Sequence, residues 1–162
     1  MHLKHISILI LLILLISCDS DKTRIELTTP GFGVVETSID ATSKTVDLPV
    51  LINTQDEIKG VQFTLKWDTK IAEVGQPKVN ELNPGFTVSA GKAVNGQMKV
   101  LMYSLAGEVL NTSESQILTI PITIINSEAD NFSLIFDNAV FAGPNAKSYE
   151  IPVTHAQLKL TR

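Results

Sequence analysis

Cys18 is the only cysteine in the chain, and the residues around it decide what chemistry its thiol can serve. Lys4 gives the N-terminus a positive charge, and residues 6–16 are almost wholly apolar. The small residue Ser17 precedes the cysteine, and the polar residues 19–22 follow it. A positive start, an apolar stretch and a small residue before a cleavage point are typical of a secretory signal peptide. The thiol is therefore expected at a processing site rather than in a catalytic centre.

This stretch resembles a bacterial lipoprotein signal peptide with its lipobox. The resemblance implies that residues 1–17 are removed, that Cys18 carries the lipid, and that residues 18–24 form a lipidated tether. A transmembrane anchor fits less well, because the apolar stretch is about half of the roughly 20 residues that a spanning helix needs. An ordinary secretion signal is the other alternative, but it does not require a cysteine at the cut.

The location implied by the resemblance is the bacterial cell envelope, with the protein attached to a membrane through the lipid on Cys18. The residues after the cysteine resemble two different sorting signals. Asp19-Ser20-Asp21 is similar to an acidic surface-export sequence of some lipoproteins, whereas an aspartate directly after the cysteine is similar to an inner-membrane retention signal. We favour the outer membrane or the cell surface.

Composition argues against catalysis and against nucleic-acid binding. Removing 17 of the 162 residues leaves 145, the size of one ordinary domain. The loss of Lys4 leaves 12 of the 13 basic residues against 17 acidic ones, so the net charge goes from −4 to −5 and does not favour nucleic acid. Only His155 remains of three histidines, too few for a zinc site and without the features of a catalytic triad around it.

Two further motifs fall short of the patterns that bind phosphate or calcium. Gly31-Phe32-Gly33 lacks the third glycine and the following helix of a phosphate-binding loop. The small acidic clusters, such as Asp56-Glu57, lack the alternating ligand spacing of a calcium loop. The sequence therefore predicts no enzyme activity, no cofactor and no metal site.

The elements that position the remaining side chains are predicted to be strands. Apolar and polar residues alternate with period two over 45–52, 60–67, 118–124 and 132–136, and Gly, Pro and Asn clusters separate these stretches. Trp67 falls on the apolar row of its stretch, so we predict that it is buried. Pro49 and Pro121 cannot donate a ladder hydrogen bond, which predicts an edge or a bulge at each. The pattern indicates an all-β sandwich.

The order of these segments resembles that of a cohesin-like domain. The segments that carry the resemblance are 45–50, 60–68, 68–74, 95–101, 118–124, 132–141 and 150–153. The resemblance implies one jelly-roll β-sandwich of about nine strands over residues 25–162. No single segment is specific, and a sandwich fold by itself does not assign a function.

In cohesins the partner binds the outer face of the sheet that holds the third, fifth, sixth and eighth strands. Carried over to this chain, the predicted partner-binding residues are Gln62, Thr64, Lys66, Leu101, Tyr103 and Ile135. The placement of Leu101 and Tyr103 requires that Val100 and Met102 point inward. In the stretch 98–103 both the odd and the even positions carry apolar residues, so alternation alone does not fix which side faces outward. A shift of one residue would exchange the two faces.

The function implied by both resemblances is that of a non-catalytic, envelope-anchored lipoprotein that presents a protein-interaction module. The implied partner is a dockerin-like protein or another envelope protein. A carbohydrate-binding module and a structural envelope subunit are the alternatives. Glycan binding needs exposed aromatic platforms. The aromatic residues outside the predicted core rows are Phe32, Phe86, Tyr103, Phe141 and Tyr149, and they do not cluster in the sequence.

Overall fold

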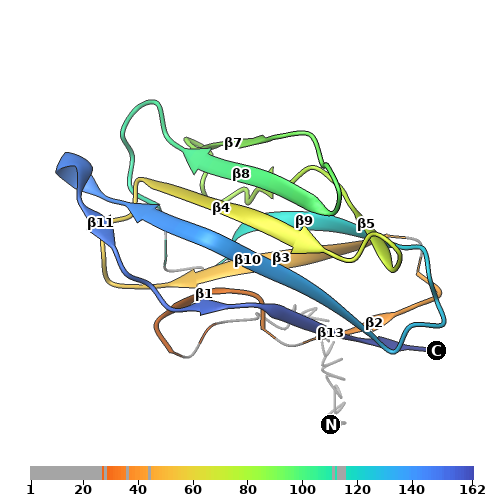
Figure 1. Cartoon of the computed structure of the whole chain (residues 1–162). Coiled ribbons are helices and arrows are strands. Elements are labelled where there is room, and N and C mark those ends of the chain that lie inside the picture. The colour runs from red at the N-terminus through yellow and green to blue at the C-terminus, as the bar shows by residue number, and fades with distance from the viewer. Residues whose placement is uncertain (1–26, 28, 36, 44, 111, 113–115) are drawn as a thin grey trace, which may run out of the picture.

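The computed structural model describes residues 27, 29–35, 37–43, 45–110, 112 and 116–162. The predictions for the signal peptide, the tether and Cys18 lie outside these residues. The described chain forms two β-sheets packed face to face, and its one helical element is the short 3-10 turn Pro144–Ala146 (Figure 1). Within this part of the chain no helix is long and apolar enough to cross a membrane.

Sheet A has the strand order β12-β1-β3-β9-β5, with β6 also paired to β9. Its strands are β1 (Gly31–Gly33), β3 (Val46–Asn53), β5 (Ala72–Val74), β6 (Lys78–Val79), β9 (Gln116–Ile124) and β12 (Val153–Thr154). The alternating apolar residues of β3 and β9, such as Leu48 and Ile120, are buried on the inner side of the sheet. The period-two pattern therefore places one side of sheet A on the core, as expected.

Sheet B has the order β2-β13-β10-β4-β8-β7, with β11 also paired to β10. Its strands are β2 (Thr37–Asp40), β4 (Gly60–Trp67), β7 (Thr87–Ala90), β8 (Gln97–Tyr103), β10 (Asn131–Ala142), β11 (Ser148–Tyr149) and β13 (Ala156–Thr161). Figure 1 shows β10, β4, β8 and β7 side by side, in front of the strands of sheet A. The all-β jelly-roll sandwich predicted from the sequence is confirmed.

The strand count differs from the expected nine. The described residues form thirteen strands, several of only two or three residues. The C-terminal stretch explains much of the difference, because it changes sheets twice: β11 pairs in sheet B, β12 in sheet A, and β13 in sheet B again. Each change of sheet ends one short strand and begins another.

Four phenylalanine rings from three strands, β1, β4 and β10, meet in the middle of the core. The ring of Phe32 lies 5.3 Å from Phe63, 5.4 Å from Phe136 and 5.2 Å from Phe141, measured between centroids. The tilted and edge-on arrangements are those that aromatic quadrupoles favour. Phe32 and Phe141 fell outside the predicted core rows, but both are buried. Phe86 is buried as well, so three of the five aromatics left over from the sequence pattern belong to the core.

Trp67 is less buried than its alternating pattern predicted. It is the last residue of β4 and packs only partly buried against the core. It borders a surface cavity together with Thr69, Glu73 and the turn at Gly96. The prediction that Trp67 is buried and packed on the core is therefore met only in part, because the residue packs against the core but stays half-buried at the end of β4, beside this cavity.

Pro49 and Pro121 both lie in interior strands of sheet A rather than on its edges. Each is nevertheless placed where a neighbouring strand is interrupted. Pro49 precedes an irregularity between Val50 and Leu51, and β1 pairs only with the residues after it. Pro121 lies between the part of β9 that pairs with β5 and the part that pairs with β6. The missing N–H is thus accommodated at breaks in the ladder, as at a bulge.

Candidate functional site

The candidate site is the solvent-facing side of β10, β4, β8 and β7, which we call the outer face of sheet B. Cross-strand partners in an antiparallel ladder point to the same side of the sheet. Gln62 of β4 lies opposite Leu101 of β8 and opposite Val140 of β10. Thr64 lies opposite Lys99 and Asp137 in the next row. The register therefore builds continuous rows of side chains across the face.

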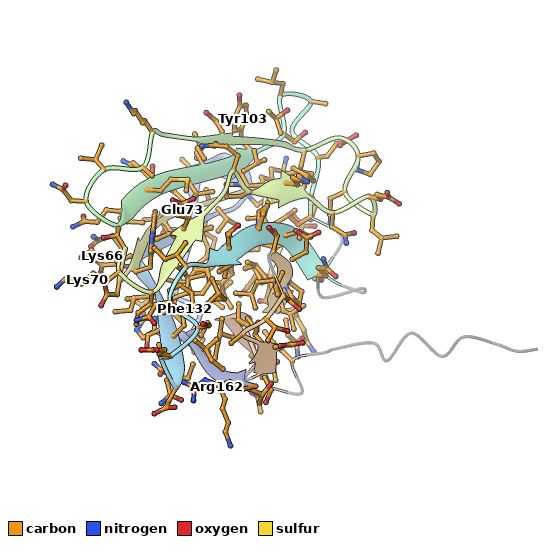
Figure 2. The ribbon with its side chains drawn as sticks, turned by 90° about the vertical axis from the view of Figure 1, so that its right-hand side faces the viewer. Lys66, Lys70, Glu73, Tyr103, Phe132 and Arg162 are labelled. Atoms are coloured by element: carbon orange, nitrogen blue, oxygen red, sulfur yellow. The ribbon has the colours of Figure 1, made fainter. Side chains whose placement is uncertain are left out.

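The structure brings all six residues predicted for partner binding onto this face. Val100 and Met102 are buried while Leu101 is 40% exposed, so the assumed orientation of β8 is correct. Lys66 and Ile135 form one end of the face as a cross-strand pair. Leu101 and Tyr103 lie towards the other end, where Tyr103 is opposite Gly60. Lys66 and Tyr103 are separated along the sheet (Figure 2). That these residues bind a partner remains a prediction.

An ion pair joins the two central strands of the face. Lys66 Nζ of β4 lies 2.5 Å from Asp137 Oδ2 of β10. The hydrogen bond from Lys66 is the main cause that lowers the pKa of Asp137, with a smaller contribution from the charge of His155. Both side chains remain more than a third exposed, so water screens the pair and its contribution to stability is small. The pair fixes the position of the Lys66 ammonium on the face.

We expect the carboxyl group of Asp137 to titrate below the ordinary aspartate value of about 3.9. Because the folded pKa is lowered, the stabilisation is present above the ordinary value and is lost as pH falls through the folded value. An NMR titration of the side-chain carboxyl measures the midpoint. The midpoint should rise in Lys66→Gln and stay unchanged in Lys99→Gln, which removes a neighbouring lysine outside the pair. Equal midpoints in Lys66→Gln and the unaltered protein would refute the assignment.

A β-bulge in β10 resets which residues of that strand face outward. Asp137 pairs with Thr64 and Val140 pairs with Gln62, so two residues of β10, Asn138 and Ala139, oppose a single residue of β4. Asn138 has a φ of 51°, a left-handed conformation that asparagine tolerates better than most residues. Its backbone and side-chain nitrogens both donate to the carboxylate of Asp137.

The bulge adds residues to the face that sequence reasoning missed. Unbroken alternation after Asp137 would turn Val140 inward and Phe141 outward. The bulge instead leaves Val140 45% exposed on the face and buries Phe141 in the core. Ala142, two positions further on, is also exposed. The available signal was Asp137-Asn138, because this pair combines a residue suited to positive φ with a side chain that can hydrogen-bond to it.

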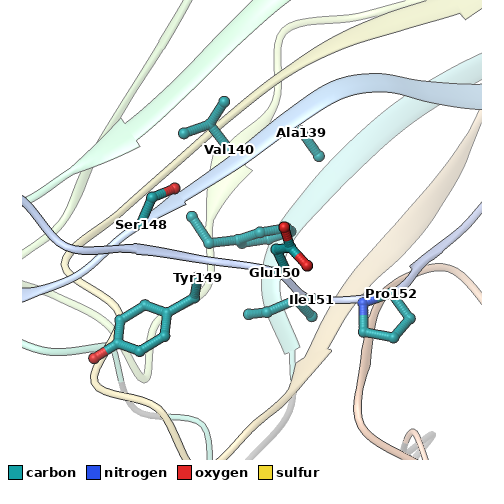
Figure 3. A pocket seen from close by; sticks show the side chains of 8 residues that line it. Ala139, Val140, Ser148, Tyr149, Glu150, Ile151 and Pro152 are labelled. Atoms are coloured by element: carbon teal, nitrogen blue, oxygen red, sulfur yellow. The ribbon is translucent and has the colours of Figure 1, made fainter.

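A second cleft lies beside the face, between β10 and the stretch 148–152. It has a volume of about 550 Å³ and is lined by Val140, Tyr149, Glu150 and their neighbours (Figure 3). The Tyr149 ring packs against Gly143, and Lys147 Nζ lies 4.2 Å from the ring centroid. Glu150 is the one carboxylate in the lining, so the cleft offers no second carboxylate or histidine for acid–base chemistry.

The described part of the chain shows neither a cluster of metal-binding side chains nor a group of neighbouring exposed aromatic rings for a sugar. Over these residues no cluster of three His, Cys, Asp or Glu side chains is arranged to hold a metal ion. His155 instead accepts a hydrogen bond from the backbone N–H of Phe136 through Nδ1. Of the five aromatic residues outside the predicted core rows, only Tyr103 and Tyr149 are partly exposed. Tyr103 lies on the outer face of sheet B, whereas Tyr149 lines the cleft beside it.

Comparison with solved structures identifies the fold. A cohesin module from a Clostridium perfringens family 33 glycoside hydrolase is similar, with a TM-score of 0.64 and 13% identity over 82% of this chain and 98% of that one. The sixth cohesin of Acetivibrio cellulolyticus scaffoldin B, solved with a dockerin, has a TM-score of 0.65 and 19% identity over 81% of this chain and 99% of that one.

A non-cellulosomal cohesin from the archaeon Archaeoglobus fulgidus is also similar, with a TM-score of 0.61 and 13% identity over 81% of this chain and 88% of that one. No protein-family model matches the sequence, and no curated protein matches it. At these identities the similarity shows the fold, and the cohesin-like fold predicted from the order of the segments is confirmed.

Proposed function

We propose that this cohesin-like domain is a non-catalytic protein-interaction module that binds its partner through the outer face of sheet B. One observation carries the proposal: the register of β10, β4 and β8 brings six side chains of mixed apolar and polar character onto one solvent-facing side of the sheet. Leu101 and Ile135 are each 40% exposed there, among polar and charged neighbours. A few apolar anchors within a polar surround are the usual make-up of a protein interface.

The face is suited to a partner that docks without refolding the domain. β4 is paired along its length with both β10 and β8, so its backbone is fixed in the free protein. A preformed surface of this kind is typical of interfaces in which the backbone moves little on binding. Similar cohesins were solved with dockerins bound, which supports a dockerin-like protein as the partner. Another envelope protein is the alternative partner in this proposal.

Truncation of Tyr103 is expected to weaken partner binding by more than about 1 kcal/mol. Tyr103 combines a large apolar ring with a hydroxyl that can hydrogen-bond, and it stands half-buried on the face opposite Gly60. The partner is captured by pull-down from the native envelope with the tagged full chain as bait. Its affinity for the unaltered protein and for Tyr103→Ala is then compared by calorimetry.

Tyr149→Ala is the matched control, because Tyr149 is also a half-buried tyrosine but lines the neighbouring cleft. Circular dichroism checks that both variants are folded. If Tyr103→Ala is folded and binds as tightly as Tyr149→Ala, Tyr103 is not an anchor. If substitutions across the whole face leave the affinity unchanged, the interface lies elsewhere.

We also propose that the domain is held at the cell envelope through a lipid on Cys18, with the outer membrane or cell surface favoured. Cys18→Ser should leave an uncleaved precursor that incorporates no labelled fatty acid, because the thiol is the attachment group that the lipobox resemblance implies. Gel mobility and fatty-acid labelling of cells measure both effects. Normal cleavage and labelling in Cys18→Ser would contradict lipidation, whereas Ser20→Ala should behave like the unaltered protein. Protease treatment of intact cells tests surface exposure.

A further inference from the structure

The outer face of sheet B is hollowed at one end, above Gly60. Gly60 is paired with Tyr103 on β8 and with Ala142 on β10, and it has no side chain to fill the space between them. The hollow has a volume of about 320 Å³. Its lining is residues 59–62, Leu101, Tyr103, Val140 and Ala142, and we call it the Gly60 socket. The bulge in β10 helps to form it, because the bulge turns Val140 outward.

Exposed apolar side chains gather around the socket. Leu101 is 40% exposed and Val140 is 45% exposed on its walls. Large apolar side chains left in water at one place on a soluble domain mark an interaction site more often than isolated ones do. The socket therefore offers a place for an apolar side chain of a partner.

The surroundings of the socket are positively charged, although the whole chain is acidic with a formal net charge of −4. Lys59 lies in the lining, and Lys99 projects from the same side of β8 as Leu101. In the described chain neither lysine takes part in an ion pair, whereas Lys66 is paired with Asp137. Glu108, in the turn after β8, has its carboxylate against Gly85. The charge next to the socket thus favours carboxylates on the partner.

The location of the socket also limits the backbone structure of what binds there. The socket opens on the face of a sheet, where the backbone of β4 is paired with β8 on one side and with β10 on the other. A segment buried against this face must satisfy its own N–H and C=O groups. An α-helix does so, and it places residues three or four positions apart on the same side as an apolar anchor.

We propose that the Gly60 socket binds one bulky apolar side chain, such as leucine, from an acidic amphipathic helix of the partner protein. Carboxylates one turn from that side chain contact Lys59 and Lys99. This inference rests on the proposed function and adds to it the chemistry of the partner. It assigns the anchor contact to the end of the face that holds Tyr103 rather than to the end with Lys66 and Ile135.

The test uses three synthetic helical peptides and the full chain. The first peptide has a central leucine with glutamates one turn before and after it, the second has alanine for the leucine, and the third has lysines for the glutamates. NMR shifts on addition of the first peptide should centre on Gly60, Leu101 and Val140. We expect it to bind roughly tenfold more tightly than each of the other two, a difference typical of one buried anchor or a matched charge pair.

Two substitutions with the same added ring separate the socket from the rest of the face. Ala142→Phe fills the socket from an exposed position, and it should remove the preference for the leucine peptide. Asn131→Phe adds the same ring to an exposed position on the same strand outside the socket, and it should leave that preference intact. Lys99→Glu should reverse the preference between the glutamate and lysine peptides.

Several results would overturn the socket proposal. These are the absence of localised shifts at millimolar peptide, equal binding of the leucine and alanine peptides, or self-association of the chain that alone produces the same shifts. If the peptides fail while Tyr103→Ala still weakens the captured envelope partner, the proposed function stands and only the socket proposal falls. If the captured partner is insensitive to both Tyr103→Ala and Ala142→Phe, both fall.

Discussion

Replacing Phe32 by alanine should destabilise the domain by about 3–5 kcal/mol, the usual cost of deleting a large buried aromatic side chain. Phe32 is fully buried, and its ring contacts three other phenylalanine rings that come from both β4 and β10. It also comes from sheet A, so its removal opens a cavity between the two sheets. Domains of this size are stable by only about 5–15 kcal/mol, so the loss is a large fraction of the total.

Guanidinium unfolding followed by circular dichroism measures the change. Val94→Ala is a suitable control, because Val94 is 59% exposed and its truncation should change the free energy of unfolding by less than about 0.5 kcal/mol. A Phe32→Ala variant as stable as Val94→Ala would mean that β1 does not pack between the sheets as described. Phe32→Leu should fall between the two, because it keeps part of the buried volume.

The strand phase of the binding face could be predicted from the sequence because it depends mainly on local alternation. Gln62, Thr64 and Lys66 alternate with strongly apolar neighbours, so only one register buries the apolar row. The sequence gives less information on which side chains of β8 face outward, since Leu101 and Tyr103 are themselves largely apolar. Its phase is decided by tertiary pairing: Val100 lies opposite the buried Phe63, which sends Leu101 outward.

β1 could not be predicted, because three residues are too few to show a period. In the sequence, Gly31-Phe32-Gly33 shows only part of a phosphate-loop pattern, whereas in the structure it is a buried strand with β3 on one side and β12 on the other. Glycine is required at its third position, Gly33, by tertiary structure. Gly33 has a φ of 142°, and a Cβ there would lie 1.9 Å from the carbonyl oxygen of Thr154 in β12. That close approach involves a residue more than a hundred positions away.

The remaining differences from the sequence pattern share one physical cause, which is that the backbone departs from regular alternation where a strand ends or contains a bulge. Trp67 follows the apolar row of β4, but the strand ends there and leaves the ring partly uncovered. Val140 and Phe141 exchange faces because β10 contains an extra residue. A bulge depends on the pairing of two strands, so a single-strand pattern gives only an indirect sign of it.

Replacing Asn138 by valine should destabilise the domain by about 1–3 kcal/mol, because a β-branched side chain is strained at the φ of 51° that the bulge requires. The strand cannot relieve this strain by straight alternation with the same number of residues, because that would turn Phe141 towards water and Val140 towards the core. Phe141 would then leave the aromatic cluster, where its ring lies 5.2 Å from Phe32. Guanidinium unfolding and the NMR shifts of Phe141 report the stability and the orientation of the strand.

Asn138→Gly is the matched control, because glycine adopts the φ of 51° at this position without strain and keeps the residue count. It should retain the bulge, leave Phe141 buried and change the free energy of unfolding by at most about 1 kcal/mol. An Asn138→Val variant that is as stable as Asn138→Gly would show that the positive φ at this position does not limit the side chains that the bulge accepts.

The bulge connects core packing to binding, because it sets the two faces of β10 together. Deletion of Asn138 removes the extra residue without exchanging these faces, since Ala139 alone then lies opposite Phe63 while Val140 stays opposite Gln62 and Phe141 opposite Val61. The deletion should therefore keep Phe141 buried and keep the leucine preference, because Val140 remains a wall of the Gly60 socket. Ala142→Phe should lose the preference, since it fills the socket from an exposed position. A folded deletion variant that has lost the leucine preference would show that the socket depends on the distortion of the bulge and not only on the direction of Val140.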